Sequence, residues 1–335
     1  MRRSIILLTL VAASALNGQT KKILVSMPDP EMFKALQQAS PGARLVPVTS
    51  TNVMSEIADA DAYIGNIKPQ EVQAGKNLKW VQVMSAGVEQ VLFASTSELR
   101  DSKIVLTNNK VVQGPEIADH ALAMLLALSR ELPTFLSNKA QEKWQPRSFH
   151  GIELNGRNAV VVGLGGIGMQ IATRAWAFGM NVTGVDPEDK PFSPFVKRVV
   201  KPDQVDEVLP DADVLFISAP HTPKSHKMIG PHQFELMKKG SYFIAVSRGG
   251  LYDMNSLVKA LDEQRLAGAG VDVTDPEPLP EGHPLWKFQN AIITPHIAGR
   301  SDKDRARMVS TIQENIRRFV DNKPLINVVD KQKGY

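Results

Sequence analysis

Cysteine is absent from all 335 residues. Its absence excludes disulfides, thiolate metal ligands and a cysteine nucleophile, and it leaves the redox compartment undecided because a chain without thiols can be exported unchanged. Basic runs are missing too. The formal net charge of +4 falls to +2 without Arg2 and Arg3, and no stripe of Lys or Arg indicates a nucleic-acid partner. The histidines show no metal-ligand spacing, so we expect no metal site.

Long apolar segments are scarce, but one stands at the start of the chain. Arg2 and Arg3 precede an apolar core over residues 5–16, and A-S-A at 13–15 has the small residues of a cleavage site. The core is short for a membrane span. We expect residues 1–20 to be an export signal for ordinary secretion or the twin-arginine route, leaving no stable membrane span after its removal. A buried first strand in a cytoplasmic protein is the alternative.

Apolar runs recur along the rest of the chain, which is 43% hydrophobic and long enough for two packed domains. The spacing predicts parallel strands with crossover helices, in an α/β fold of two Rossmann- or flavodoxin-like sheets with a cleft between them. Residues 114–136 predict one apolar helix starting at Pro115, buried on most sides. The expected strands lie at 23–26, 43–48, 62–66, 80–84 and 104–108, then in NAVVVG, MNVTGVD, ADVLFISAP, SYFIAVS, GAGVDV and NAIITPH.

A glycine-rich motif, GLGGIG at 163–168, follows the strand Val160–Val162 and opens a helix. Its first glycine permits a tight turn, its second lets the backbone approach a pyrophosphate, and its third lets the helix pack on the sheet. The N–H groups at the helix start would face the phosphates. The residues expected at the cofactor are Gly163, Gly165, Gly166, Ile167 and Gly168.

Asp186 ends the next strand and indicates which dinucleotide binds. Its carboxylate could accept hydrogen bonds from the adenosine ribose hydroxyls and would repel a 2′-phosphate, which favours NAD over NADP. Lys190 and Arg198 keep NADP as an alternative. Asp186 could instead cap the turn before Pro187.

Three later segments carry ionisable residues near strand ends: Arg248 in IAVSRGGLYD, Asp272 and Glu277 in GVDVTDPEPLP, and His296 in IITPHIAG. Taken singly, the arginine could form a surface ion pair, the glutamate could lie in a proline-rich loop, and the histidine could cap a strand. In this order behind a dinucleotide motif, they resemble the signatures of the D-isomer-specific 2-hydroxyacid dehydrogenases. KWVQVMSAGVEQV is similar to the substrate loop of the glyoxylate/hydroxypyruvate reductase branch.

The resemblance implies an NAD-dependent homodimer that interconverts small 2-oxo acids and D-2-hydroxy acids. Arg248 would hold the substrate with its planar fork of donors, together with the backbone N–H groups of Ala86 and Gly87. His296 would exchange the proton, as an imidazole can near neutral pH, and Glu277 would orient the ring and stabilise the imidazolium. By the same resemblance, the cofactor is also lined by Ala219, Thr222, Val246, Ser247 and Asp272.

The resemblance also implies domain boundaries. We expect a flavodoxin-like substrate domain of residues 21–114 plus 301–335, with a nucleotide-binding domain of residues 115–300 inserted into it. The helix after Ser301 would then pack with the N-terminal unit. Ala245 stands where the family commonly has asparagine. The alternative function is a non-catalytic NAD(H)-sensing binding protein of the same fold.

The remaining histidines are given no acid–base role. His120 is expected to be buried and hydrogen-bonded, and His221 and His226 flank a loop that the family uses against the cofactor. We expect His150, His232 and His283 in loops.

Overall fold

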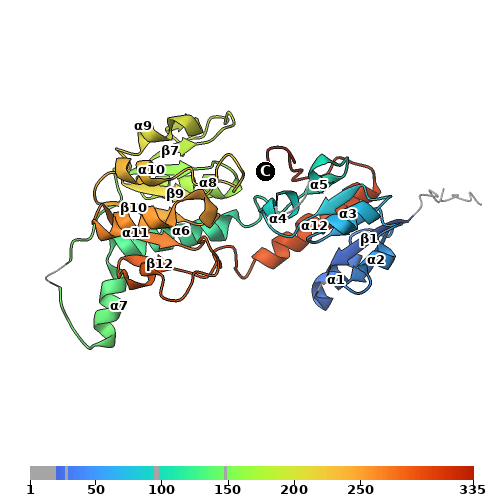
Figure 1. Cartoon of the computed structure of the whole chain (residues 1–335), viewed down its shortest axis with the longest axis horizontal. Coiled ribbons are helices and arrows are strands. Elements are labelled where there is room, and N and C mark those ends of the chain that lie inside the picture. The colour runs from blue at the N-terminus through green and yellow to red at the C-terminus, as the bar shows by residue number, and fades with distance from the viewer. Residues whose placement is uncertain (1–19, 27–28, 94–97, 147–148) are drawn as a thin grey trace, which may run out of the picture.

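The structure is a computed structural model that describes residues 20–26, 29–93, 98–146 and 149–335. It contains two parallel sheets, each in a separate lobe (Figure 1). The α/β prediction is therefore confirmed. Residues 1–19 of the expected export signal lie outside the described residues.

The first lobe contains the five strands expected before residue 109, in the order β2-β1-β3-β4-β5 and all parallel. Short helices connect them. The strands are β1 (Lys21–Ser26), β2 (Ala43–Val48), β3 (Ala62–Ile64), β4 (Trp80–Gln82) and β5 (Val105–Thr107). The helices are α1 (Pro30–Gln37), α2 (Val53–Glu56), α3 (Pro69–Ala74), α4 (Glu89–Leu92) and α5 (Glu98–Asp101).

Helix α12 (Asp304–Val320) returns to this first lobe, as predicted (Figure 1). Ile312 and Ile316 on its apolar face are fully buried in one cluster with Ile23 of β1. The Asn315 amide donates to Gln82 Oε1 on β4 at 2.9 Å. Residues far apart in sequence thus share one core.

The second lobe contains a seven-stranded parallel sheet in the order β12-β11-β10-β9-β6-β7-β8. Six of its strands were predicted. The seventh, β8, was missed because it is a short edge strand with two exposed residues and no apolar run. The strands are β6 (Asn158–Val162), β7 (Asn181–Val185), β8 (Arg198–Val200), β9 (Val214–Ile217), β10 (Ser241–Ala245), β11 (Leu266–Val271) and β12 (Ala291–Ile293). The main helices are α8 (Gly166–Ala177), α9 (Val205–Val208), α10 (Pro231–Leu236) and α11 (Met254–Asp262).

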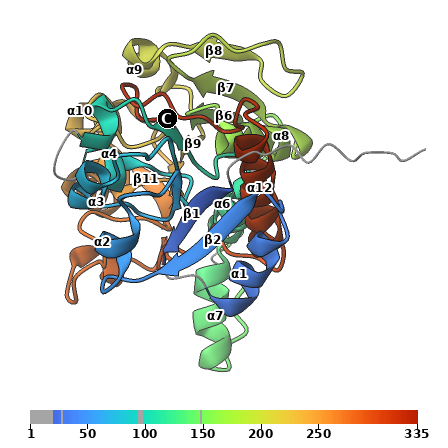
Figure 2. The same cartoon turned by 90° about the vertical axis from the view of Figure 1, so that its right-hand side faces the viewer.

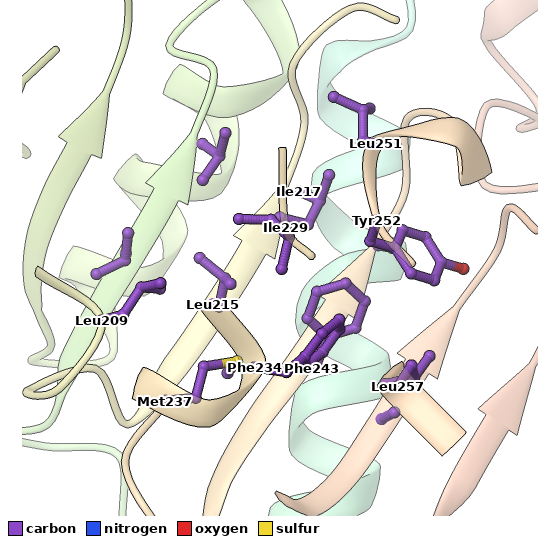
Figure 3. Packing of buried hydrophobic residues seen from close by; sticks show 14 of the residues in the cluster. Leu209, Leu215, Ile217, Ile229, Phe234, Met237, Phe243, Leu251, Tyr252 and Leu257 are labelled. Carbon is purple, nitrogen blue, oxygen red and sulfur yellow. The ribbon is translucent and has the colours of Figure 1, made fainter. Parts of the chain in front are cut away.

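Both faces of this second sheet are buried, as expected when helices cover a parallel sheet on both sides. On one face, Phe243 of β10 lies between Phe234 and Tyr252, with ring centroids 5.3 and 5.0 Å away (Figure 3). On the other face, Val161 of β6 packs with Leu125 of the long helix described next. Each such side chain contributes about 1.5–3 kcal/mol by its burial, so the strand ends are held on a rigid support.

The expected single helix over 114–136 is wrong, because the chain forms α6 (Gly114–Ser129) and α7 (Leu132–Ala140) with a break between them. Pro133 lacks the N–H that would bond the Ser129 carbonyl, and that carbonyl instead accepts Ile152 N at 3.0 Å. Glu131 at the break has a φ of 53°. Helix α6 is largely buried, as predicted, whereas α7 projects from the lobe (Figure 1).

A membrane-spanning candidate would be a long, apolar helix. Over residues 20–26, 29–93, 98–146 and 149–335, no helix is both long and apolar enough to cross a membrane.

Candidate active site

The glycine motif forms a tight turn between β6 and α8. Gly163 has a φ of 89°, and a Cβ there would lie 2.6 Å from the backbone of Ala219. A Cβ on Gly168 would overlap the Gly163 carbonyl, so both positions require glycine for packing. Around Gly165, in contrast, a Cβ would meet nothing within 4 Å. The open side of the turn is therefore at the glycine expected to face the pyrophosphate.

Helix α8 starts beside this open side, with Gly165 as its N-terminal flanking residue and Gly166 and Ile167 in its first turn. A Cβ on Gly166 would lie 2.7 Å from the Val111 backbone. Gly166 thus also permits close contact with the connection between the lobes. The turn and the helix N-terminus together fit a dinucleotide pyrophosphate.

Asp186, buried at the end of β7, braces the glycine turn. Its Oδ2 accepts Leu164 N at 2.7 Å, and its Oδ1 accepts Glu188 N at 2.9 Å and pairs with Lys190 Nζ at 3.0 Å. The turn-capping contact considered from the sequence is therefore present. Its role as a ribose acceptor stays a prediction.

Other residues expected at the cofactor follow the carboxyl ends of neighbouring strands. Strands β6, β9 and β10 are adjacent in the sheet, and their carboxyl ends share one edge. Ala219 approaches Gly163, and Thr222 lies in the loop after β9. Val246 and Ser247 follow β10 directly, and both are buried. Ala245, the last residue of β10, is fully buried in the core.

The structure brings His296 and Glu277 together, with Nδ1 of the ring 2.6 Å from Oε1. Both side chains are about two-fifths exposed, at 40% and 39%. His296 has a φ of 53°, in the left-handed region that few residues other than glycine adopt, although asparagine, aspartate and histidine do so more often than the rest. Such backbone strain is found at functional sites, where surrounding contacts hold it.

Asp272 holds the loop that carries His296. Its carboxylate accepts Thr294 Oγ1 at 2.6 Å and the N–H groups of Ile297 and Ala298, each at 2.9 Å. Asp272 is only 2% exposed, and the contacts that it makes stabilise this loop. Its place beside the nicotinamide stays a prediction. His120 is hydrogen-bonded as expected, with Nε2 2.9 Å from Thr294 Oγ1, but its side chain is 22% exposed, so the prediction that it is buried is wrong.

Arg248 lies where the two lobes meet. Its Nε donates to Glu89 Oε1 of the first lobe at 2.7 Å, and its Nη1 donates to the Ser247 carbonyl at 2.7 Å. A Cβ on Gly87 would overlap the guanidinium as it is placed here, so a side chain at this position would displace Arg248. Among the described residues, Nη2 has no hydrogen-bond partner, and it is the nitrogen nearest Gly87.

A cavity of about 90 Å³ lies beside this guanidinium. It is mostly polar and small, so it suits a compact polar ligand. It is lined by Asn66, Val83, Ser85, Gly87, Val88, Glu89, Gln90, Val91 and Arg248.

In the loop of residues 85–87 beside the cavity, two backbone carbonyls accept hydrogen bonds from side chains. Asn108 Nδ2 donates to the Ala86 carbonyl, and Ser85 Oγ donates to the Gly87 carbonyl, both at 2.6 Å. Within the described part of the chain, the N–H groups of Ala86 and Gly87 have no partner. Gly87, one of the two residues whose N–H groups were predicted to bind substrate, lines the cavity, and Ala86 precedes it in the same loop.

Sequence reasoning missed the partner of Arg248. Glu89 stands within the quoted SAGVEQV segment, two residues after Gly87, but its carboxylate gave no signal of a contact across 159 residues. The same reasoning missed that His221 and His226 pair at 3.0 Å. Burial, and then His226, lower the pKa of His221.

The prediction for His232 is wrong. It lies in α10, where Pro231 at the first helical position starts the helix. His283 caps a single 3-10 turn, and His150 lies in a loop. Among the residues that the structure describes, no cluster of His, Asp and Glu could hold a metal ion.

The parallel sheets, the glycine turn and the Asp-ended second strand define a dinucleotide-binding α/β protein. The sequence model "D-isomer specific 2-hydroxyacid dehydrogenase, NAD binding domain" matches residues 122–298. The chain belongs to this family, and the prediction of NAD as cofactor is confirmed at that level.

Two curated relatives indicate the range of the family. A glyoxylate reductase of Korarchaeum cryptofilum is 30% identical over 295 residues, which cover 85% of this chain and 87% of the relative. A D-3-phosphoglycerate dehydrogenase of Methanocaldococcus jannaschii is 29% identical over 314 residues, covering 92% of this chain. The chain spans 59% of that relative's length, and 49% of the corresponding Archaeoglobus fulgidus protein.

Solved structures agree with this fold. The TT0316 protein of Thermus thermophilus is 31% identical with a TM-score of 0.75, and the match covers 92% of this chain and 99% of that one. An NADPH-dependent glyoxylate/hydroxypyruvate reductase of Sinorhizobium meliloti is 23% identical with a TM-score of 0.81, covering 94% and 100%. The second likeness concerns the fold alone.

Proposed function

We propose that the protein is an NAD-dependent oxidoreductase that interconverts small 2-oxo acids, of the glyoxylate or hydroxypyruvate type, and D-2-hydroxy acids. The observation that carries this proposal is the Arg248 guanidinium beside a small polar cavity, in a chain that also pairs His296 with Glu277. The cavity size favours short acids. The glyoxylate reductase among the relatives supports the same substrate class.

Each residue has one task in this reaction. The substrate carboxylate binds the Arg248 guanidinium and the free N–H groups of Ala86 and Gly87. The dinucleotide, when bound on the glycine turn, supplies the hydride for the carbonyl carbon. His296 gives a proton from Nε2 to the carbonyl oxygen, because its Nδ1 is held by Glu277.

The proposal is tested by following NADH oxidation with glyoxylate, hydroxypyruvate, pyruvate and a bulky branched 2-oxo acid. Turnover of the short acids in preference to the bulky one supports it. A protein that binds NADH and reduces none of them would be the non-catalytic NAD(H)-sensing protein instead.

Replacement of Asp186 by alanine is expected to relax the preference for NADH. The carboxylate would repel a 2′-phosphate, and without it Lys190 loses its partner and can pair with that phosphate. We expect the ratio of kcat/KM for NADH over NADPH to fall by about 10-fold or more, equivalent to about 1.4 kcal/mol. Glu235→Ala is the matched control, because Glu235 is an exposed carboxylate of α10 that pairs with Lys259 at 3.7 Å. A wild-type preference for NADPH would contradict the ribose role of Asp186.

We propose that a second copy of the chain covers α7 and the loop after it. Large apolar side chains are exposed there, at 46% for Leu132, 65% for Leu136 and 94% for Trp144, and their burial would stabilise a dimer. Leu136→Asp is expected to give a monomer in sedimentation at micromolar concentration, because it places a charge in an apolar interface. Phe192→Asp, at an exposed position on another loop, should leave the dimer intact. A wild-type monomer would refute the proposal.

We also propose export directed by residues 1–20, on the sequence pattern alone. Fractionation of a bacterial host, with intact mass of the product, tests it. Cytoplasmic protein with its original N-terminus would refute export, and periplasmic protein from an Arg2→Lys, Arg3→Lys variant would rule out the twin-arginine route.

A further inference from the structure

The segment Asp330–Tyr335, here called the strap, leaves the first lobe beside β5. Val329 N donates to the Leu106 carbonyl at 2.9 Å, which fixes the start of the strap to that strand. The Lys331 ammonium is enclosed by the carbonyls of Leu99, Ser102 and Ile104, at 3.0, 2.6 and 2.9 Å. Its burial lowers the pKa of Lys331. The strap is therefore rooted in the first lobe.

The strap closes on itself through its own hydrogen bonds. Asp330 N donates to the Tyr335 carbonyl at 3.0 Å, and Gly334 N donates to the Asp330 carbonyl at 2.8 Å. The Asp330 carboxylate also accepts Gln332 N and Lys333 N. A φ of 84° at Gly334 permits the turn. The result is a compact loop with its backbone held by its own hydrogen bonds.

This loop reaches the second lobe, with the C-terminus between the two lobes in Figure 1 and in front of the second lobe in Figure 2. A Cβ on Gly334 would lie 2.7 Å from Phe93, at the end of α4, and 3.3 Å from Thr222 of the loop after β9. Lys333 Nζ pairs with Glu188 Oε1 at 2.7 Å, and the Tyr335 hydroxyl lies 3.0 Å from the same oxygen. The strap thus joins two loops of the NAD-binding lobe to the first lobe.

The loop that carries Glu188 marks the adenosine end of the dinucleotide site. Glu188 stands two residues after Asp186, and in such folds an acidic residue at the end of the second strand contacts the adenosine ribose. Burial, and then the hydrogen bond with Glu188, raise the pKa of Tyr335 to about 12, so its hydroxyl is a donor at neutral pH. Lys333 brings positive charge to an edge that Asp186 and Glu188 make negative.

We propose that the strap is a further part of the cofactor site, and that Tyr335 and Lys333 close the adenosine end of the bound dinucleotide from the opposite lobe. The phenol gives the adenosine an apolar face with a polar tip. The Lys333 ammonium reduces the repulsion between the nearby carboxylates and an anionic ligand.

This inference rests on the cofactor part of the proposed function, and binding measurements without substrate test it. Dissociation constants would be measured by calorimetry for NADH, ADP-ribose and reduced nicotinamide mononucleotide. Tyr335→Ala is expected to weaken binding of NADH and ADP-ribose by about 5- to 20-fold, the size of one aromatic contact with its hydrogen bond. Binding of the mononucleotide, which lacks adenosine, is expected to stay unchanged.

Two further variants separate this role from a structural one. Gln332→Ala changes an exposed side chain of the same strap and should alter none of the three constants. Tyr335→Phe keeps the ring and should weaken NADH binding by about 2- to 5-fold, which remains measurable if Tyr335→Ala fails to fold.

Three results would overturn the inference. Tighter NADH binding by Tyr335→Ala would make the strap a competitor of the cofactor. Equally weakened binding of NADH and of the mononucleotide would mean that the strap acts only on the structure of the lobes. Unchanged dissociation constants would mean that the strap is no part of the cofactor site. A wild type that binds NADH yet reduces no 2-oxo acid would refute the proposed reaction and leave this test unaffected.

Discussion

Replacing His296 by alanine is expected to lower kcat for reduction of a short 2-oxo acid by about 10²–10⁴-fold, the range typical of lost general acid–base catalysis. Proton donation to the carbonyl oxygen has to accompany hydride transfer, and His296 is the imidazole whose Nδ1 is held at 2.6 Å by a carboxylate. The dissociation constant for NADH should change little, because the glycine turn lies on other strands.

Two variants check this assignment in steady-state kinetics. Glu277→Gln keeps a hydrogen-bond acceptor for the ring but loses the charge, so we expect an intermediate loss of kcat. His232→Ala removes an exposed imidazole on α10 and should leave kcat unchanged. If His296→Ala kept more than about a tenth of the wild-type rate, His296 would not be the proton donor.

Local patterns account for the parts of the fold that were predicted. Buried parallel strands are continuous apolar runs, so β6, β9 and β10 are readable from the sequence. The strand β8 lies at the edge of the sheet, where it pairs with β7 alone and two of its three residues are exposed. It therefore needs no apolar run. The break at Glu131 was missed because the apolar spacing continues past Pro133, although the ring cannot occupy a helix interior.

The candidate site also has parts that the sequence predicts and parts that it does not. The glycine turn and Asp186 were both identified from their spacing within one strand–turn–helix–strand unit, but the hydrogen bond from Leu164 N to the Asp186 carboxylate was not predicted. The pairing of Glu277 with His296, which lie 19 positions apart, followed from the family resemblance. The contacts of Glu89 with Arg248 and of Tyr335 with Glu188 join different lobes across 159 and 147 residues. No local pattern encodes them, since they depend on how the two sheets are placed.

Replacing Arg248 by alanine is expected to lower kcat/KM by about 10³-fold or more, chiefly through KM. Charged hydrogen bonds contribute about 1.5–3 kcal/mol each, and the substrate carboxylate would lose two or more. The variant also leaves the Glu89 carboxylate beside the cavity without its partner, where it would repel an anionic substrate.

The contribution of Glu89 can be separated with a double variant. Because the repelling carboxylate is then gone, Arg248→Ala with Glu89→Ala should recover part of the loss seen in Arg248→Ala alone. Arg248→Lys keeps the charge without the planar fork, and we expect it to lie between wild type and Arg248→Ala. All three should bind NADH as the wild type does, which calorimetry would show. An unchanged KM for glyoxylate or hydroxypyruvate in Arg248→Ala would mean that the substrate carboxylate binds elsewhere, and that Arg248 serves only to join the lobes through Glu89.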